Sequence, residues 1–572
     1  ICRAVDGLPL AIELAASWAR VMTPGEIALE LERNLDLLET NLQDVPARHR
    51  SIRVVFDQSW VLLSDEERRV LLDLSVFAGG FTRQAAEAAA GASLAVLSSL
   101  VSKSLLRFNP KTNSYDFHEL IRQNALARFR QQPSAAQQAA FERFCRYYSA
   151  WLAGLEEALK SPRQAEISSA IRLETANWLA AWRWAAENHR LDLLRPMVPC
   201  LYWYYEIHGN FAEALALYRH AVSRLRECGA PDCLEGAEEK AAFAFLVDQL
   251  GWFEFRTGGV ETAASLFAES RSLAQGFQDH EVLYHIHGNW GYMALLIGRI
   301  DEAQQLTAAS LENARALRSP WHIAIPISVL GIIELQRGNL PEARRQLADS
   351  LRAWRVVGDP RGIIFTLLYL GSTALAQGSL DVAAGFLRES TAIAEEKKDR
   401  WAQATSLDLL GQVALASGQI EKARSLLEQS LALSKEIGDQ WTRTQTTIHL
   451  GEAQAAAGLE REAALLYLEA YSSARQGGWP PAVLEALVAL AGVQTGAAAQ
   501  TRLAAVLSAL AHPALAPAVR RKAERLRARL AEELTPDQVE AAAAEASAER
   551  AARLAEEVFA LAESEAEPGP GW

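Results

Sequence analysis

Apolar and polar positions alternate with a fixed long period along the second half of the chain. Six stretches align without gaps: LGWFEFRTGGVETA, WGYMALLIGRIDEA, LGIIELQRGNLPEA, LGSTALAQGSLDVA, LGQVALASGQIEKA and LGEAQAAAGLEREA. Each stretch begins 40 residues after the previous one. The first glycines of the six stretches are Gly251, Gly291, Gly331, Gly371, Gly411 and Gly451. A second glycine recurs at the same 40-residue spacing, at Gly258, Gly298, Gly338, Gly378, Gly418 and Gly458. An alanine does so as well, at Ala263, Ala303, Ala343, Ala383, Ala423 and Ala463. A period in this range is typical of stacked helical hairpins.

Each repeated position has a physical reason. The first glycine lets a second helix approach the first, the second glycine closes the turn with left-handed backbone, and the alanine packs between the helices. One hairpin cannot bury its own apolar face, so neighbours must stack. The pattern resembles the tetratricopeptide repeat in a long form. It predicts a right-handed α-solenoid of about seven repeats over residues 206–480, the first (YWYYEIHGNFAEAL) displaced by an insert.

The segment before the repeats has a different pattern. GLPLAIELAA opens a helix, Ser64 and Glu67 form a capping-box signature before the apolar run of LSDEERRVLLDLSVF, and LLRFNPKTNSYDF alternates around a turn as a β-hairpin does. We therefore expect an all-α chain with one small hairpin. Its expected parts are a helical segment (1–55), a winged-helix domain (56–132), linking helices (133–205), the repeats (206–480), capping helices (481–565) and a disordered tail (566–572).

Two short motifs in this segment resemble the NB-ARC or STAND type of signalling ATPase. GLPLA resembles its conserved turn and FHELIR its histidine motif, and ARHRSIRVVFDQSWVLLSDEE between them is typical of bacterial transcriptional regulators in that group. The resemblance implies that Pro9 packs on an adenine and that His118 touches the β-phosphate of bound ADP. Without the resemblance, Pro9 would only shape a helix start and His118 would be a structural histidine.

The chain also departs from that family. It has no Gly-x-x-x-x-Gly-Lys-Ser/Thr loop, and Glu119 stands where the family's aspartate follows the histidine. We expect a C-terminal fragment whose phosphate-binding domain lies upstream. ADP or ATP, with magnesium, would then belong to the intact protein, and this fragment alone would bind no cofactor and hydrolyse no ATP.

Composition narrows the partners. The formal charge is −13 and no basic block offsets it, which argues against direct binding to nucleic acid. The five scattered cysteines suit a reducing cytoplasm, and neither a signal peptide nor a membrane-spanning run is evident. His280, His285 and His287 are close in sequence, but their helical spacing does not suit a metal, so we expect no metal site.

The inner groove of the solenoid is the expected binding surface. By helical spacing around the first glycines, it should include Asp248, Trp252, Arg256, Tyr292, Ser328, Gln336, Ser372, Asp408, Gln412 and Glu452. Such a groove suits a protein, a peptide or a small inducer. Trp321, Trp401 and Trp441 recur near the starts of the first helices, where they either pack between repeats or stack on a ligand.

Together these features favour the sensor portion of a STAND-type switch, in which a bound partner or inducer shifts His118 relative to ADP and permits nucleotide exchange. In such a switch, assembly into oligomers on activation is possible, and the upstream nucleotide-binding domain would be a partner in cis. The alternative is a plain protein-binding scaffold that binds no nucleotide. An enzyme in its own right is disfavoured because no nucleophile–base pair stands out. DNA binding by the winged helix is disfavoured because its helices are acidic or neutral.

Overall fold

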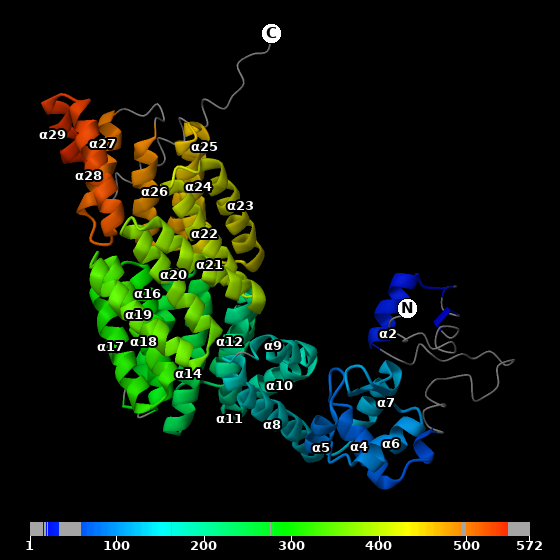
Figure 1. The fold of residues 1–572 in the computed structure, drawn as a ribbon. Coiled ribbons are helices and arrows are strands. Elements are labelled where there is room, and N and C mark those ends of the chain that lie inside the picture. Colours follow the sequence, from blue (N-terminus) through cyan, green and yellow to red (C-terminus); the bar gives the residue numbers. More distant parts are fainter. Residues whose placement is uncertain are drawn as a thin grey trace. The chain divides into compact units, whose positions relative to one another are not determined.

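Helices make up nearly all of the fold in the computed structural model (Figure 1). The structure describes residues 15–16, 19, 21–33, 59–161, 163–274, 276–277, 279–493 and 499–546. The chain divides into two compact units. Unit 1 comprises residues 1–155 and 168–197, and unit 2 comprises residues 156–167 and 198–572.

Unit 1 begins with helices and continues into a short hairpin. Its elements are α2 (Pro24–Arg33), α4 (Asp65–Leu74), α5 (Arg83–Ala90), α6 (Leu94–Ser102), β1 (Leu106–Asn109), β2 (Ser114–Phe117), α7 (Glu119–Phe129), most of α8 (Ser134–Leu159), the end of α9 (Gln164–Leu173), α10 (Thr175–Glu187), α11 (Leu191–Leu194) and η4 (Arg195–Met197). The strands pair antiparallel with Leu106 opposite Phe117. The predicted hairpin and the capping box of Ser64 with Glu67 are thus confirmed.

One asparagine ties two distant parts of unit 1 together. Asn177 on α10 is almost fully buried. Its Oδ1 accepts from the backbone N–H groups of Ala78 and Gly79, both at 3.0 Å, and its Nδ2 donates to the carbonyl of Gly80 at 2.7 Å. One side chain therefore satisfies three backbone groups of the loop that follows α4.

Unit 2 is the predicted stack of paired helices, side by side in green to yellow in Figure 1. After α12 (Val198–His208) and α13 (Phe211–Glu227), the first helices of the pairs, here called A helices, are α14 (Ala237–Arg256), α16 (His280–Leu296), α18 (Pro320–Gln336), α20 (Pro360–Ala376), α22 (Arg400–Ala416) and α24 (Gln440–Ala456). The second, or B, helices are α15 (Val260–Leu273), α17 (Ile300–Ala316), α19 (Leu340–Val357), α21 (Leu380–Lys397), α23 (Ile420–Ile437) and α25 (Glu460–Gln476). The final helices are α26 (Pro480–Gly492), α27 (Ala499–Ala511), α28 (Pro517–Glu532) and α29 (Pro536–Glu545). Successive A helices contact one another, so they line the inner face of the stack.

The repeated glycines and alanines do what the sequence predicted. A Cβ on Gly371 would lie 2.7 Å from the side chain of Leu387, and one on Gly411 would lie 2.6 Å from that of Leu427, so only glycine allows the B helix this close. The second glycines all have positive φ, from +73° at Gly418 to +97° at Gly258. The six repeat alanines are fully buried.

The stack winds far enough for separate turns of the superhelix to meet. A Cβ on Gly258, after α14, would lie 3.9 Å from Cβ of Gln440, which starts α24. A Cβ on Gly298, after α16, would lie 2.6 Å from Cβ of Ala514. The turns that end early A helices therefore rest against later parts of the chain, and the inner face is closed along this edge.

Some predictions fall outside the described residues or remain undecided. Pro9, most of residues 1–55 and the tail at 566–572 lie outside the described part of the chain. The winged-helix and domain boundaries stay predictions. Among the described residues no single helix has the length and apolarity to cross a membrane, and the bent pair α5 and α6 reaches them only together, at 107°.

Candidate functional site

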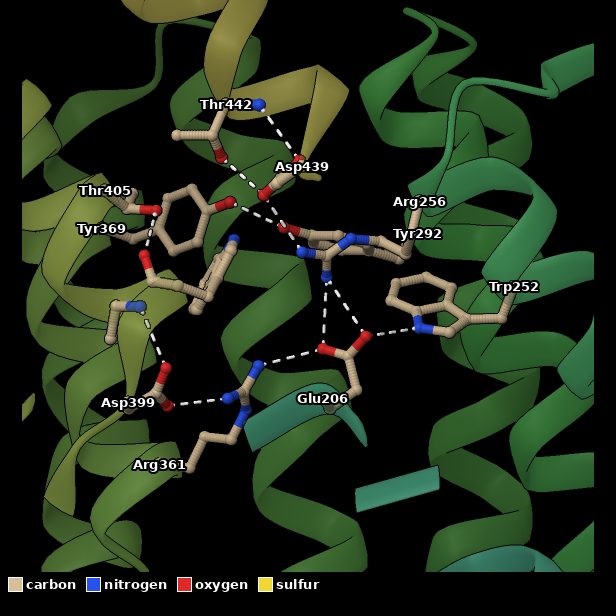
Figure 2. Close-up of polar contacts among 12 residues, drawn as sticks. Glu206, Trp252, Arg256, Tyr292, Arg361, Tyr369, Asp399, Thr405, Asp439 and Thr442 are labelled. Atoms are coloured by element: carbon tan, nitrogen blue, oxygen red, sulfur yellow. Dashed lines mark hydrogen bonds and ion pairs between the residues drawn. The ribbon is translucent and has the colours of Figure 1, made fainter. Parts of the chain in front are cut away.

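A buried carboxylate on α12 lies at the centre of unit 2. Figure 2 shows Glu206 accepting from the Trp252 Nε1–H at 2.8 Å, from Arg256 at 3.1 Å and from Arg361 at 2.9 Å. Trp252 and Arg256 belong to α14 and Arg361 to α20, so one side chain joins elements that lie 50 and 155 residues away in sequence. Because α12 also contacts α22, this helix occupies the inner face of the stack.

Two aspartates complete the network on the far side of the arginines. Arg256 Nη2 donates to Asp439 at 3.1 Å, and Arg361 Nη1 donates to Asp399 at 2.6 Å (Figure 2). All five charged residues of this set, here called the Glu206 network, are at most 8% exposed. Buried charges of both signs are tolerable when each has partners, as here.

The aspartates serve two purposes at once. Asp399 and Asp439 are the N-caps of α22 and α24: one oxygen accepts from the backbone N–H of Ala402 or Thr442, while the other accepts from an arginine. Asp359 caps α20 in the same way, and its second oxygen accepts from Trp321 Nε1 at 2.5 Å. Helix capping thus positions the acceptors that hold the inner face together.

An aromatic cavity lies beside this network. Its volume is about 140 Å³, and it is lined by residues of α12, α14, α16, α17, α18, α19, α20 and α22 and by Asp359. The rings that line it include those of Trp203, Trp252, Tyr292, Trp321, Trp354 and Trp401. Trp203 and Trp321 meet edge to face with 5.1 Å between their centroids. The sequence left open whether these recurring tryptophans pack between repeats or stack on a ligand. Trp321 and Trp401 pack between repeats and also face this cavity, whereas Trp441 packs on Trp479.

Burial perturbs the ionisation of this region. Burial raises the pKa of Asp359 and of Asp399, against the lowering effect of their hydrogen-bond donors. For Arg256, burial alone would lower the pKa, but the carboxylates of Glu206 and Asp439 outweigh it and raise the pKa. The Arg256 guanidinium therefore stays charged, whereas burial disfavours the charged forms of Asp359 and Asp399.

The structure brings together three of the predicted groove residues. Trp252 and Arg256 bind Glu206, and Tyr292 follows on the next A helix, where its hydroxyl lies 2.9 Å from that of Tyr369. The side chains of Trp252, Arg256 and Tyr292 face α12 and the cavity, because α12 lies in the groove beside α14 and α16.

The remaining predicted groove residues lie apart from that centre. Asp248 is fully buried and accepts from Asn289 and Gln249, and Ser328 lies 2.6 Å from the hydroxyl of Ser350 in the interior between helices. Further along, Asp408 and Gln412 contact His449, and Glu452 binds Lys522. Gln336, Ser372, Gln412 and Glu452 remain partly exposed.

His118 lies immediately before α7, as its N-cap residue, and is partly buried. The neighbouring Glu119 carboxylate accepts from Arg122 and Gln123. The other predicted nucleotide contact, Pro9, is outside the described residues. The given sequence contains no Gly-x-x-x-x-Gly-Lys-Ser/Thr pattern.

Sequence reasoning missed several residues of the centre. Glu206 gave no signal, because α12 precedes the regular period. The residues that cap the A helices did give a signal: four aspartates and one serine follow one another at 40-residue steps directly before these helices, at Asp279, Ser319, Asp359, Asp399 and Asp439. A buried serine on the B helices keeps the same period at Ser270, Ser310, Ser350, Ser390 and Ser430, and four of these donate to a carbonyl of the paired A helix.

Comparisons with known proteins agree with the repeat architecture. Residues 322–396 match the family model described as tetratricopeptide repeat. A protein of Mycobacterium tuberculosis (strain ATCC 25618 / H37Rv) named "Putative HTH-type transcriptional regulator Rv0890c" is 30% identical over 333 residues. That alignment covers 50% of this chain and 37% of the relative, so the chain spans little more than a third of the relative's length.

Two solved structures share the helical architecture at a distance. One is the STAND protein with a tetratricopeptide repeat sensor from Pyrococcus horikoshii, with a TM-score of 0.48, 16% identity, and coverage of 91% of this chain and 72% of that one. The other is a Rap protein complexed with competence and sporulation factor, with a TM-score of 0.46, 12% identity, and coverage of 67% and 98%. Both TM-scores are below 0.5, so neither likeness bears on function.

Proposed function

We propose that this chain is the sensor portion of a transcription regulator, and that its repeats bind a protein or peptide partner. The observation that carries the proposal is the row of partly exposed polar side chains at equivalent positions of successive A helices: Ser372, Gln412 and Glu452. Stacked repeats use such inner rows to hold extended partners. The regulator named among the relatives supports the output, transcription.

The partner site lies on the later A helices in this proposal. The earlier part of the inner face is occupied by α12 and the Glu206 network, whereas α20, α22 and α24 keep polar groups accessible. Gln412 and Glu452 make contacts within the chain, to Asp408 and Lys522, that a partner could exchange.

The test is selection of peptides from a displayed random library on the whole chain. Selected peptides should lose at least ten-fold in affinity on Gln412→Ala and Glu452→Ala, and should keep it on Glu428→Ala, an exposed residue of a B helix. Peptides that bind all three variants equally well would place binding elsewhere and reject this site.

Coupling to a nucleotide is a further part of the proposal. In a longer protein that includes a phosphate-binding domain, Pro9 and His118 would flank ADP, and this chain alone would not hydrolyse ATP. His118→Ala should then release ADP faster than wild type. Unchanged ADP retention would favour the plain scaffold instead. No step of the partner binding described above depends on a nucleotide.

A further inference from the structure

The aromatic cavity of unit 2 has the size of a small-molecule site. At about 140 Å³ it matches cavities of roughly 150 Å³ that hold a benzene ring. It lies inside the stack beside Glu206, apart from the polar row proposed for a peptide. A ligand here would contact several repeats at once.

The lining rings already attract positive charge. The Lys160 ammonium lies 3.9 Å from the ring centroid of Trp321, and the Arg256 and Arg361 guanidiniums lie 5.7 Å and 5.1 Å from that of Trp401. Ring faces are electron-rich, and a cation held over them within about 6 Å is stabilised. The Trp252 ring also lies near a guanidinium, that of Arg256 at 5.8 Å, whereas other rings of the cavity, such as those of Tyr292 and Phe365, offer the same kind of surface to a ligand.

The charge balance around the cavity also favours a cation. Glu206 and Asp359 line the cavity together with the guanidiniums of Arg256 and Arg361, and the carboxylates of Asp439 and Asp399 lie on the far side of these guanidiniums. The cluster as a whole therefore holds four carboxylates and two guanidiniums. The nearby pair of Lys160 with Glu156, 2.5 Å apart, is neutral as a whole and does not change this excess. An anionic ligand would add to the buried negative charge, whereas a cation would reduce it.

Two polar groups of the cavity wall have no hydrogen-bond partner in the described structure. They are the Trp203 Nε1–H and the Thr307 hydroxyl. Because buried polar groups nearly always have a partner, each is a place where a ligand oxygen can bind.

We propose that this cavity binds a small organic cation about one ring in size, whose ammonium group faces the ring surfaces and the carboxylate excess. The proposal rests on the proposed sensor role, in which the bound cation would be the inducer. Since the ligand contacts residues of α12, α14, α18 and α20, its binding would stabilise the closed inner face.

The test uses three probes of one shape and different charge: benzylammonium, benzyl alcohol and benzoate. Each is titrated into the whole chain and followed by calorimetry and by tryptophan fluorescence, which reports on the cavity rings. We expect saturable binding with benzylammonium at least ten-fold tighter than benzoate and tighter than benzyl alcohol. Binding of none of the three, equal binding of the cation and the alcohol, or tightest binding of benzoate would each overturn the proposal.

Three variants test whether the probe binds in this cavity and whether its binding depends on the charge there. Ile325→Trp fills the cavity and should abolish benzylammonium binding, whereas Ile323→Trp, on the same helix but not in the lining, should leave it unchanged. Glu206→Gln should reduce the advantage of the cation over the alcohol, and an undiminished advantage would overturn the charge argument. Failure of these probes leaves the peptide selection intact, and failure of the peptide selection leaves the probe result intact, so the two proposals are separable.

Discussion

Glu206→Gln is the substitution that most directly weakens the centre of unit 2. Glu206 is 4% exposed and receives bonds from Trp252, Arg256 and Arg361. Glutamine has nearly the same shape, so the change removes the negative charge and one acceptor oxygen and creates little cavity. The neutral side chain leaves each arginine with one carboxylate, Asp439 or Asp399.

The expected cost follows from those remaining partners. Removing one partner of a buried ion pair costs about 3–5 kcal/mol when the other charge is left alone. Because both arginines here keep a carboxylate, we expect the free energy of unfolding to fall by about 2–3 kcal/mol. The exposed pair of Arg355 and Glu389 provides the control, since Glu389→Gln should cost less than about 1 kcal/mol.

Urea unfolding followed by tryptophan fluorescence measures both variants, because Trp252 and Trp203 lie beside Glu206. A helical stack need not unfold in one step, so the comparison uses the transition that these tryptophans report. If the two variants lose equal stability, Glu206 does not hold the inner face together, and the role assigned to α12 is refuted.

Three further predictions concern single positions. Burial raises the pKa of Asp248 from 3.8 to about 8, so the free energy of unfolding should fall as the pH rises from 3.8 to about 8 and should level off above that pH. Asp248→Asn keeps an acceptor for Asn289 and should flatten that fall in pH-dependent urea titrations. Burial alone would lower the pKa of His449, but Asp408 at 2.9 Å outweighs it and raises the pKa from 6.5 to about 9. The stability that this pair contributes is complete below pH 6.5 and is lost as the pH rises through 9. His449→Gln should remove that loss, and a variant with the pH profile of the wild type would contradict the role assigned to His449. Gly371→Ala should lower the free energy of unfolding by about 1–3 kcal/mol, and with it the thermal midpoint, because its Cβ would meet Leu387. Gly385→Ala lies on a helix with open space around it and should raise the midpoint. The reverse order of the two midpoints would contradict the packing described.

The repeat fold was predictable because its signals are local and periodic. Gly371, Gly378 and Ala383 act within one hairpin, so their spacing alone indicates the close approach, the turn and the packing. The hairpin of unit 1 was predictable for the same reason, from alternation around a turn.

The centre of the site was only partly predictable. Trp252, Arg256 and Tyr292 follow from helical spacing, but their partner Glu206 lies on a helix outside the period, and no local pattern states where that helix will pack. The number of repeats per superhelical turn decides that Arg256 meets Asp439, 183 residues away. Small differences in the packing of each repeat set that number, and sequence spacing does not express them.

The central claim is that the repeats wind until the first A helix meets the start of α24 and closes the inner face around α12. An engineered disulfide between Gly258→Cys and Gln440→Cys tests it directly, because the Cβ positions are 3.9 Å apart, close to the disulfide mean of about 3.8 Å. Peptide mapping of the oxidised protein by mass spectrometry should find this cross-link in most molecules. The control pair Gly378→Cys with Gln440→Cys places the first cysteine at the same turn position of another repeat, with open space around it, and should form none. Equal yields from both pairs, or no cross-link from the first, would contradict the account.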